Sequence, residues 1–250
     1  MSDDRAAIIL AAGKGERMES DIPKVLHRIR GRPMITILMD TLARLNFTRL
    51  IVVIGYKGEL VKDELSEYPV SFVWQHEQLG TGHAVQMARD VLGDFIGTTL
   101  VALGDVPFLP ARSIEKLFEV HEETKAAATC LSAIVNNPAG YGRIVREGNS
   151  SIMKGIIEDK DASKQVRQIQ EINTGTFCFD TQQLFAALDK VDNKNKQGEY
   201  YLTDTIKIMR NNGLRVAVVT AENPDEVLGV NSIEQLELLA KKFAYSGRQS

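Results

Sequence analysis

Apolar runs alternate with helical patterns through the first half of the chain. Four short apolar runs predict strands near residues 6–12, 49–56, 69–75 and 98–105. Amphipathic spacing predicts helices after Pro33, over residues 57–68, from Thr81 to about Leu92, and after Pro110. Because the strands are almost wholly apolar and alternate with helices, the pattern predicts a largely parallel sheet with helices on both faces.

The second half has a different pattern. Apolar runs near residues 128–135, 141–147, 150–158 and 174–180 lie closer together, with Asn, Gly and Pro between them. This spacing predicts a smaller mixed-sheet or hairpin region. Helices are expected near residues 181–190, 202–212 and 232–243, and the tail over 240–250 is expected to fray. No hexapeptide repeat of the kind that builds a β-helix is present.

The length and composition indicate one α/β domain. A chain of 250 residues can bury one large core, and we expect a nucleotide-binding half over about 1–110 and a second half over about 111–250. The net charge of −3 argues against a nucleic-acid partner. However, residues 14–32 contain six Lys or Arg against three Asp or Glu. This local excess favours a small polyanionic ligand.

The cysteines and the N-terminus indicate a cytoplasmic protein. Cys130 and Cys178 lie in apolar runs with no Cys-rich spacing, so we expect buried, reduced thiols. The apolar run after MSDDR is too short and too acidic in its flank for a signal peptide, and no run reaches membrane-spanning length. We therefore expect a soluble cytoplasmic protein with no membrane partner.

The first strand runs into a glycine-rich, charged loop, LAAGKGERMESDIPK, at residues 10–24. A dinucleotide-binding G-x-G-x-x-G motif needs a small third residue, and Met18 stands there. A P-loop sequence G-x-x-x-x-G-K-[ST] is absent. Both a dinucleotide-dependent dehydrogenase and a P-loop ATPase are therefore disfavoured.

The same loop has the chemistry of a phosphate site. Gly13 and Gly15 allow backbone N–H groups to face phosphate oxygens, and Arg17 and Lys24 add two cations. Pro23 restrains the backbone directly before Lys24 and so helps to aim its ammonium group. Two cations on one loop suit a reaction at a triphosphate, where negative charge accumulates on the leaving pyrophosphate.

The stretch LAAGKGERMESDIPKVLHRIRGRPM closely resembles the signature of bacterial N-acetylglucosamine-1-phosphate uridylyltransferases. The wider sugar-nucleotidyltransferase superfamily shares only the G-x-G-x-R…P-K skeleton. The resemblance continues over about residues 8–232 and implies a Rossmann-like nucleotide-diphospho-sugar transferase fold with a smaller sugar-binding lobe.

The segment QHEQLGTGHA, from Gln75, resembles the base-reading segment of that family. An amide such as that of Gln75 or Gln78 can both donate to and accept from a uracil edge. Gly80 allows a close backbone approach, and we expect Thr81 to act as the N-cap of the following helix. We interpret His83 as structural, because nothing in the sequence pairs it with a base or a metal.

A single carboxylate, Asp105, follows the strand at 98–105 and precedes a proline. Mg²⁺ takes one or two protein oxygen ligands together with substrate phosphates and water, so Asp105 fits a metal-bridging role. The resemblance implies Asn231, in VLGVNS, as the second ligand.

Three further segments, PAGYGRIVRE, IIEDKDAS and EINTGTFCFD, resemble the sugar-site segments of the family. They imply Gly140, Glu158 and Asn173 as sugar contacts. The aromatic pair of QGEYYLTD, Tyr200 and Tyr201, either lines the sugar pocket or only packs.

The resemblance thus implies a Mg²⁺-dependent reaction in which UTP and N-acetyl-α-D-glucosamine 1-phosphate give UDP-N-acetylglucosamine, a cell-wall precursor, and pyrophosphate. Arg17 and Lys24 would be catalytic, with Arg17 on the leaving pyrophosphate and Lys24 nearer the reacting centre. The nucleotide site would comprise Leu10, Ala11, Ala12, Gly13, Gly15, Lys24, Gln75, Gln78, Gly80 and Thr81. The sugar site would comprise Asp105, Gly140, Glu158, Asn173 and Asn231, of which Asp105 and Asn231 would also hold the metal.

Three alternatives remain open from the sequence. A sister nucleotidyltransferase would use another nucleotide or sugar, a glycosyltransferase would consume a UDP-sugar, and a non-catalytic protein would only bind one. A glycosyltransferase usually carries D-x-D, whereas Asp105 stands in GDVP. The bifunctional members of the family continue into an acetyltransferase β-helix, which supports their trimerisation; we expect no such domain and no acetyl-CoA chemistry here, and the oligomeric state stays open from the sequence.

Overall fold

The computed structural model describes residues 4–18, 20–148 and 153–243. Its centre is a sheet whose first strand, β1 (Arg5–Ala11), is apolar on both sides. Ala6 and Ile8 pack into one core and Ala7 and Ile9 into the other. A strand that is buried on both faces requires a layer of helices on each side of the sheet.

The strands follow the order β11-β7-β10-β6-β1-β4-β5, and β8 and β9 extend from β10 as a hairpin. Their bounds are β4 Arg49–Ile54, β5 Ser71–Trp74, β6 Thr98–Leu103, β7 Ala128–Ile134, β8 Arg143–Arg146, β9 Met153–Ile157, β10 Glu171–Asp180 and β11 Val216–Thr220, with a separate ribbon of β2 Arg28–Ile29 and β3 Arg32–Pro33. Within the main path only β10 is antiparallel to its neighbours. The predicted, largely parallel sheet is therefore confirmed.

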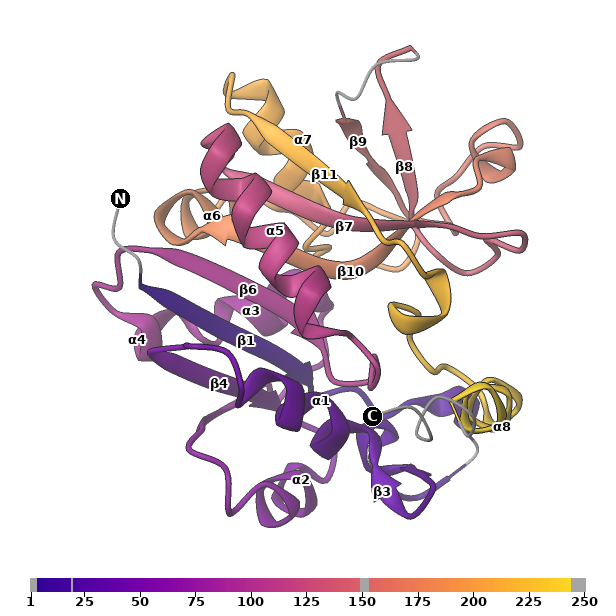
Figure 1. Cartoon of the computed structure of the whole chain (residues 1–250). Helices are drawn as coiled ribbons and strands as arrows, with labels where there is room; N and C mark the ends of the chain where they lie inside the picture. The colour runs from indigo at the N-terminus through magenta and orange to yellow at the C-terminus, as the bar shows by residue number, and fades with distance from the viewer. Residues whose placement is uncertain (1–3, 19, 149–152, 244–250) are drawn as a thin grey trace.

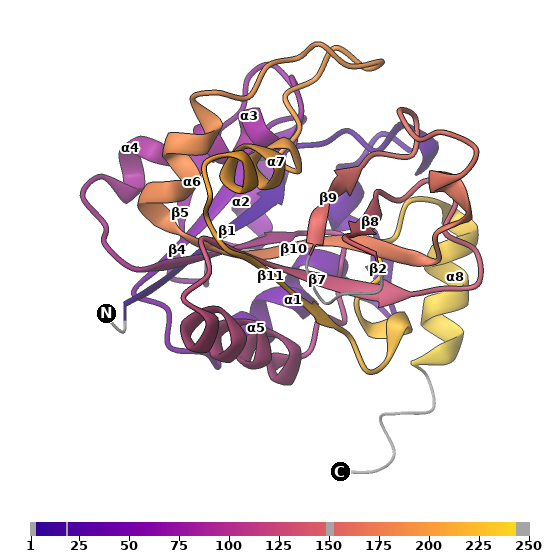
Figure 2. The same cartoon turned by 90° about the horizontal axis from the view of Figure 1, so that it is seen from above.

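Helices cover the two faces separately (Figures 1 and 2). One face carries α1 Met34–Leu42, α2 Gly58–Glu64 and α5 Ala111–Thr124, and the other carries α3 Thr81–Gln86, α4 Arg89–Leu92, α6 Thr181–Leu188 and α7 Asp204–Asn211. The last helix, α8 Ile233–Lys242, lies beside β2 instead. Short 3₁₀ turns complete the chain: η1 Glu16–Met18, η2 Lys24–Leu26, η3 Val166–Gln168 and η4 Pro224–Glu226.

Two predicted elements differ from the structure, and β2, β3 and β11 have no predicted counterpart. The helix predicted from Thr81 to Leu92 is divided into α3 and α4, because the N–H of Ala88 bonds to the carbonyl of Val85 and tightens the turn. The strand predicted at 174–180 begins earlier, at Glu171, where it pairs with Ile134 of β7. The strand β11 was not predicted at all.

The prediction for the cysteines is met, and parts of two other predictions lie outside the described residues. Both cysteines are buried and free. Among the described residues, no helix is long and apolar enough to cross a membrane. The start of the strand predicted at 150–158 and the end of the tail predicted to fray, at 244–250, lie outside the described residues.

Candidate active site

The loop after β1 positions Lys24 through two backbone features. Gly15 has a φ of +71°, and a Cβ there would lie 2.6 Å from the Cβ of Lys24. Only glycine accommodates this approach without strain. Pro23 directly precedes the turn η2, which starts at Lys24. The expectation that the loop aims the Lys24 ammonium thus has a local structural basis.

The first cavity lies where β1 and β6 end, as expected for the carboxyl edge of a parallel sheet. Its volume is about 320 Å³. Its walls are Leu10, Ala11, Ala12, Gly13, Lys24, Val25, Gln75, Gln78, Gly80, Thr81, Ala84, Leu103, Asp105, Glu199 and Asn231. Every residue predicted for the nucleotide site is among them except Gly15, which instead packs against the stem of Lys24.

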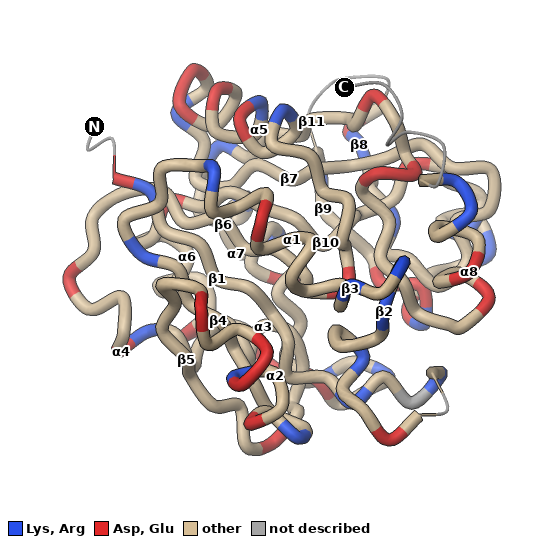
Figure 3. The backbone as a smooth tube through the Cα atoms, turned by 60° about the horizontal axis from the view of Figure 1, so that its bottom comes forward, with Lys and Arg blue, Asp and Glu red and all other residues tan. Residues whose placement is uncertain are grey.

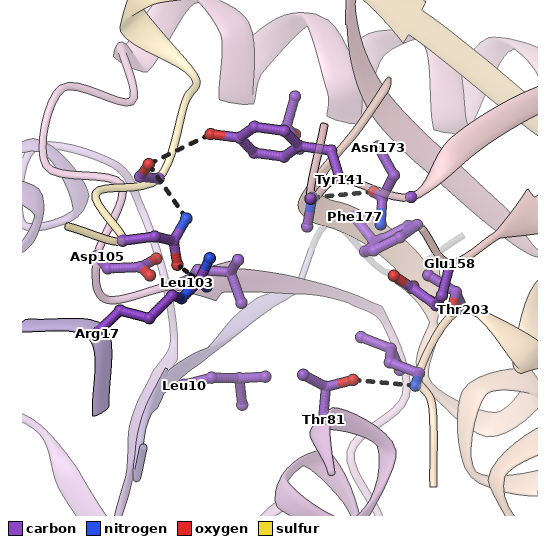
Figure 4. A pocket seen from close by; sticks show the side chains of 17 residues that line it. Leu10, Arg17, Thr81, Leu103, Asp105, Tyr141, Glu158, Asn173, Phe177 and Thr203 are labelled. Atoms are coloured by element: carbon purple, nitrogen blue, oxygen red, sulfur yellow. Dashed lines mark hydrogen bonds between the residues drawn. The ribbon is translucent and has the colours of Figure 1, made fainter. Parts of the chain in front are cut away.

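The second cavity adjoins the first and has a volume of about 190 Å³. All five residues predicted for the sugar site line it, and so does Arg17 (Figure 4). The cavities share Leu10, Thr81, Leu103, Asp105 and Asn231. Two adjoining cavities therefore meet at a wall that contains Asp105 and Asn231.

An irregularity in β10 directs polar groups into the second cavity. The register with β7 shifts between Asn173 and Phe177. Gly175 has a φ of +80°, and a Cβ at this position would collide with the side chain of Leu103. Such bulges re-aim side chains. The Oδ1 of Asn173 accepts from the N–H of Gly175 at 2.9 Å, which leaves the amide nitrogen to face a ligand.

Glu158 lies across the second cavity from Asp105 (Figure 4). Its Oε1 accepts a hydrogen bond from the hydroxyl of Thr203 at 2.8 Å. Burial raises the pKa of the Glu158 carboxyl, although the Thr203 hydroxyl opposes that effect. Thr203 was not singled out from the sequence. Its segment, QGEYYLTD, was recognised, but neither Tyr200 nor Tyr201 lines this cavity.

Four polar side chains meet at the junction of the cavities. The ammonium of Lys24 forms an ion pair with Asp105 and donates to Oδ1 of Asn231 at 3.1 Å. Arg17 donates to the same oxygen, also at 3.1 Å. Both predicted catalytic cations are thus brought together beside both predicted metal ligands. Which phosphate each cation contacts stays a prediction.

Only some of the basic residues in the segment 14–32 contribute to the junction of the two cavities. Figure 3 shows Lys and Arg positions at β2 and beside β3. Arg32 pairs with Asp40 at 2.5 Å, and Arg28 donates to the carbonyl of Gly31. Neither lines a cavity. The local charge excess therefore overstated the number of cations at the site.

Tertiary packing holds Asn231 in place. The N–H of Val230 bonds to the carbonyl of Asp105 at 2.9 Å, and the N–H of Asn231 bonds to Gln235 of α8 at 2.7 Å. A small core, formed by Met18, Ile29, Met34, Val230 and Leu239, fixes α8 against the N-terminal loop. The segment that was paired with Asp105 by resemblance therefore lies directly beside it.

The oxygen atoms at the junction are suited to a hard divalent cation. Oδ1 of Asp105 is buried and has no hydrogen-bond partner, and a Cβ on Gly229 would lie 3.3 Å from it. A carboxylate oxygen and an amide oxygen are ligands of the kind that Mg²⁺ prefers. Among the described residues there is no group of three or more His, Cys, Asp or Glu side chains for a metal. Substrate phosphates and water would supply the remaining ligands.

The base-reading segment is organised differently from the expectation. Thr81 is not a side-chain cap, because Gly80 occupies the N-cap position of α3 and the Thr81 hydroxyl accepts from the N–H of Leu202 at 3.1 Å. Gln78 donates to the backbone carbonyl of Gln75 at 2.9 Å. The amide nitrogen of Gln75 faces the Gly80 carbonyl at 3.0 Å and Nδ1 of His83 at 3.1 Å. Gln75 therefore uses its amide donors within the protein.

Comparisons with known proteins support a nucleotide-transferring family. A family model described as "MobA-like NTP transferase domain" matches residues 7–171. The "Bifunctional protein GlmU" of Bacillus cereus (strain AH187) is 47% identical over 241 residues, or 95% of this chain and 52% of that protein. Its counterpart in Enterococcus faecalis (strain ATCC 700802 / V583) is 47% identical over 229 residues, or 92% and 50%. This chain thus spans about half the length of these curated relatives.

The fold has a counterpart among solved structures. The crystal structure of UDP-glucose pyrophosphorylase complexed with UDP-glucose matches with a TM-score of 0.77 and 17% identity, over 98% of this chain and 100% of that chain. At this identity the likeness shows the fold alone. The predicted nucleotide-diphospho-sugar transferase fold is therefore confirmed.

Proposed function

Because the chain belongs to the MobA-like NTP transferase family, we propose that it is a uridylyltransferase. Its substrates would be UTP and N-acetyl-α-D-glucosamine 1-phosphate, and its products UDP-N-acetylglucosamine and pyrophosphate. One observation carries the proposal: two adjoining cavities share a wall at Asp105 and Asn231, and two cations reach that wall. One cavity suits the nucleotide and the other suits the sugar phosphate.

The reaction needs positioning and charge neutralisation rather than a general base. The phosphate oxygen of the sugar 1-phosphate is already an anion. It would form a bond to the α-phosphorus of UTP while the bond from that phosphorus to the bridging oxygen of pyrophosphate breaks. Lys24 would neutralise charge near the reacting phosphorus, and Arg17 would stabilise the leaving pyrophosphate. Glu158 and Asn173 would orient the sugar.

We propose Mg²⁺ as the cofactor, with Asp105 and Asn231 as the protein ligands. The unpartnered carboxylate oxygen of Asp105 supports this choice. When bound, Mg²⁺ would supply charge neutralisation at the two substrate phosphates. In this structure the Lys24 ammonium is paired with the other carboxylate oxygen of Asp105, Oδ2, and it would move from there toward the phosphates.

Each half of the chain would bind mainly one of the two substrates. We assign the nucleotide to residues 1–110 and the sugar phosphate mainly to residues 111–250, within one domain. Buried, free thiols support a reducing compartment, so we propose a cytoplasmic location.

A matrix of substrates tests the proposal. The protein is incubated with Mg²⁺, each of UTP, CTP, TTP and ATP, and the 1-phosphates of N-acetylglucosamine, N-acetylgalactosamine and glucose, and pyrophosphate release is measured. We expect the highest rate with UTP and N-acetylglucosamine 1-phosphate. Release only with another pair would identify a sister nucleotidyltransferase. No release with any pair, together with binding of UDP-N-acetylglucosamine, would instead favour a non-catalytic binding protein.

A further inference from the structure

The side-chain amide of Gln75 is held in one orientation by two neighbours. Gln75 follows β5, and its backbone N–H bonds to Ile54 of β4 at 2.8 Å, which fixes its main chain. The residue as a whole is only 3% exposed. The amide nitrogen donates to the carbonyl of Gly80 and faces Nδ1 of His83. Since a carbonyl can only accept, the group that faces Gly80 must be the NH₂ end of the amide.

The position of the Gly80 carbonyl is itself fixed. Gly80 has a φ of +112°, and a Cβ there would lie 2.6 Å from the carbonyl oxygen of Tyr200. The N–H of Tyr200 bonds to Leu79, and the N–H of Gly82 bonds to Tyr200, each at 2.8 Å. These contacts hold the loop before α3 in place. The Gly80 carbonyl, which accepts a hydrogen bond from the Gln75 amide, therefore cannot rotate freely.

His83 is the second hydrogen-bond partner of the Gln75 amide. Its ring nitrogen Nδ1 lies 3.1 Å from the Gln75 nitrogen and must accept, because that amide nitrogen has only donors. The ring therefore carries its proton on Nε2. With both N–H groups engaged, Gln75 has one free polar atom, Oε1, which has no partner among the described residues. Gln75 lines the first cavity.

We propose that His83 is a positioning residue for base selection: by accepting from Gln75 it keeps Oε1 as the group offered to the base. An oxygen that only accepts favours a base with a ring N–H, such as N3–H of uracil. It disfavours cytosine, whose N3 is an acceptor, because two acceptors would then face each other. This inference rests on the proposed function and reverses the structural interpretation of His83 from the sequence.

Two substitutions of His83 distinguish its role as a hydrogen-bond acceptor from a role in packing. In His83→Asn, the side-chain oxygen occupies the place of Nδ1 and can still accept. In His83→Leu, a methyl group takes that place, and one N–H of Gln75 is free to turn toward the cavity. The matched control is Gln86→Leu, on the same helix, since Gln86 contacts Asp189 at 3.3 Å rather than Gln75.

The test measures the dissociation constants of UTP and CTP by calorimetry and kcat/KM for pyrophosphate release with each nucleotide. We expect His83→Leu to narrow the preference for UTP over CTP by about 10-fold. His83→Asn should stay within about threefold of the wild-type ratio, and Gln86→Leu should not change it. If His83→Leu does not fold, His83→Ala removes the acceptor without adding a methyl group.

An unchanged UTP-to-CTP ratio in His83→Leu, even with a lowered Tm, would overturn the inference while leaving the proposed function intact. A wild-type protein that prefers CTP would contradict both the inference and the proposed function. A wild-type protein that neither binds nor turns over any nucleotide would refute the proposed function itself.

Discussion

At the scale of residues, the site depends on a few atoms with unmet bonding capacity. Oδ1 of Asp105 is buried without a partner, the Gln75 oxygen has no partner among the described residues, and Lys24 and Arg17 converge on one amide oxygen. Buried polar atoms are usually satisfied within a fold. Both Oδ1 of Asp105 and Oε1 of Gln75 belong to residues that line the cavities, where substrate groups would satisfy them.

Lys24 allows the most direct test of the proposed chemistry. Lys24→Ala should lower kcat by roughly 100-fold, the scale for loss of one preorganised charge-stabilising group. The control is Lys14→Ala, because Lys14 is exposed on the same loop and lines neither cavity. Steady-state pyrophosphate release measures both variants. A near-normal kcat in Lys24→Ala would exclude this cation from the mechanism.

Asp105 should control the metal requirement. Asp105→Asn removes a charge from the proposed ligand set, so we expect the Mg²⁺ concentration for half-maximal rate to rise and calorimetric binding of Mn²⁺ to weaken. Asp90→Asn changes an exposed carboxylate on α4 and serves as the control. A metal dependence identical to that of the wild type would argue against Asp105 as a ligand.

At the scale of elements, two local features of the sheet shape the site. The antiparallel strand β10 contains the bulge that opens toward the second cavity, and the sequence did not reveal its direction. β11 was missed although its residues VAVVT are mostly β-branched, a composition typical of strands. That run could have been predicted. The direction of β10 could not, because strand direction is set by pairing partners rather than by periodicity.

The helix α5 provides a test of stability against pH. His121 is buried on its apolar face beside Thr129 of β7, with Nδ1 at 3.0 Å from the Thr129 hydroxyl. Burial lowers the pKa of His121 from 6.5 to about 4. Between these two values the unfolded chain binds the proton and the folded chain does not. The free energy of unfolding should therefore fall as the pH drops from 6.5 to about 4, by roughly 2–3 kcal/mol from this group.

Urea unfolding at several pH values measures this effect. His121→Gln cannot titrate, so its free energy of unfolding should decline less between pH 6.5 and about 4 than that of the wild type. Both proteins contain the same carboxylates, so the contribution of these groups cancels when the free energies of unfolding of the two proteins are subtracted. If the free energy of unfolding changes equally with pH in both proteins, His121 is excluded as a source of acid sensitivity.

At the scale of the whole molecule, one sheet joins the two halves. β10 pairs with β6 of the first half and with β7 of the second, and Asn231 near the end of the chain lies beside the loop after β1. Because the cavities share a wall at this seam, neither half would complete the site alone.

A shared sheet predicts cooperative unfolding. Trp74 of β5 is the only tryptophan and lies in the first half, so its fluorescence reports on that half, whereas far-UV circular dichroism reports on both. In urea the two transitions should have coincident midpoints, as expected for a single two-state unit. Separate midpoints would show that the halves unfold independently and would contradict the single-domain proposal.

Much of this architecture follows from the sequence itself. The alternation of buried runs and amphipathic helices determined the parallel sheet, and the glycines and cations after β1 predicted a phosphate site at its carboxyl edge. Both rest on local periodicity and on the geometry of parallel sheets. The positions of Lys24, Gln75 and Asp105 follow for the same reason, since each closely follows a strand or the loop after it.

Only the tertiary structure decided how these groups act on one another. Asn231 meets Asp105 because a small core fixes α8 against the N-terminal loop. Glu158 bonds to Thr203 across two elements, and the Gln75 amide is oriented by a loop that the Tyr200 segment clamps. Such contacts join residues that are distant in sequence, and they form only when packing brings their elements together; no local pattern of the sequence contains them.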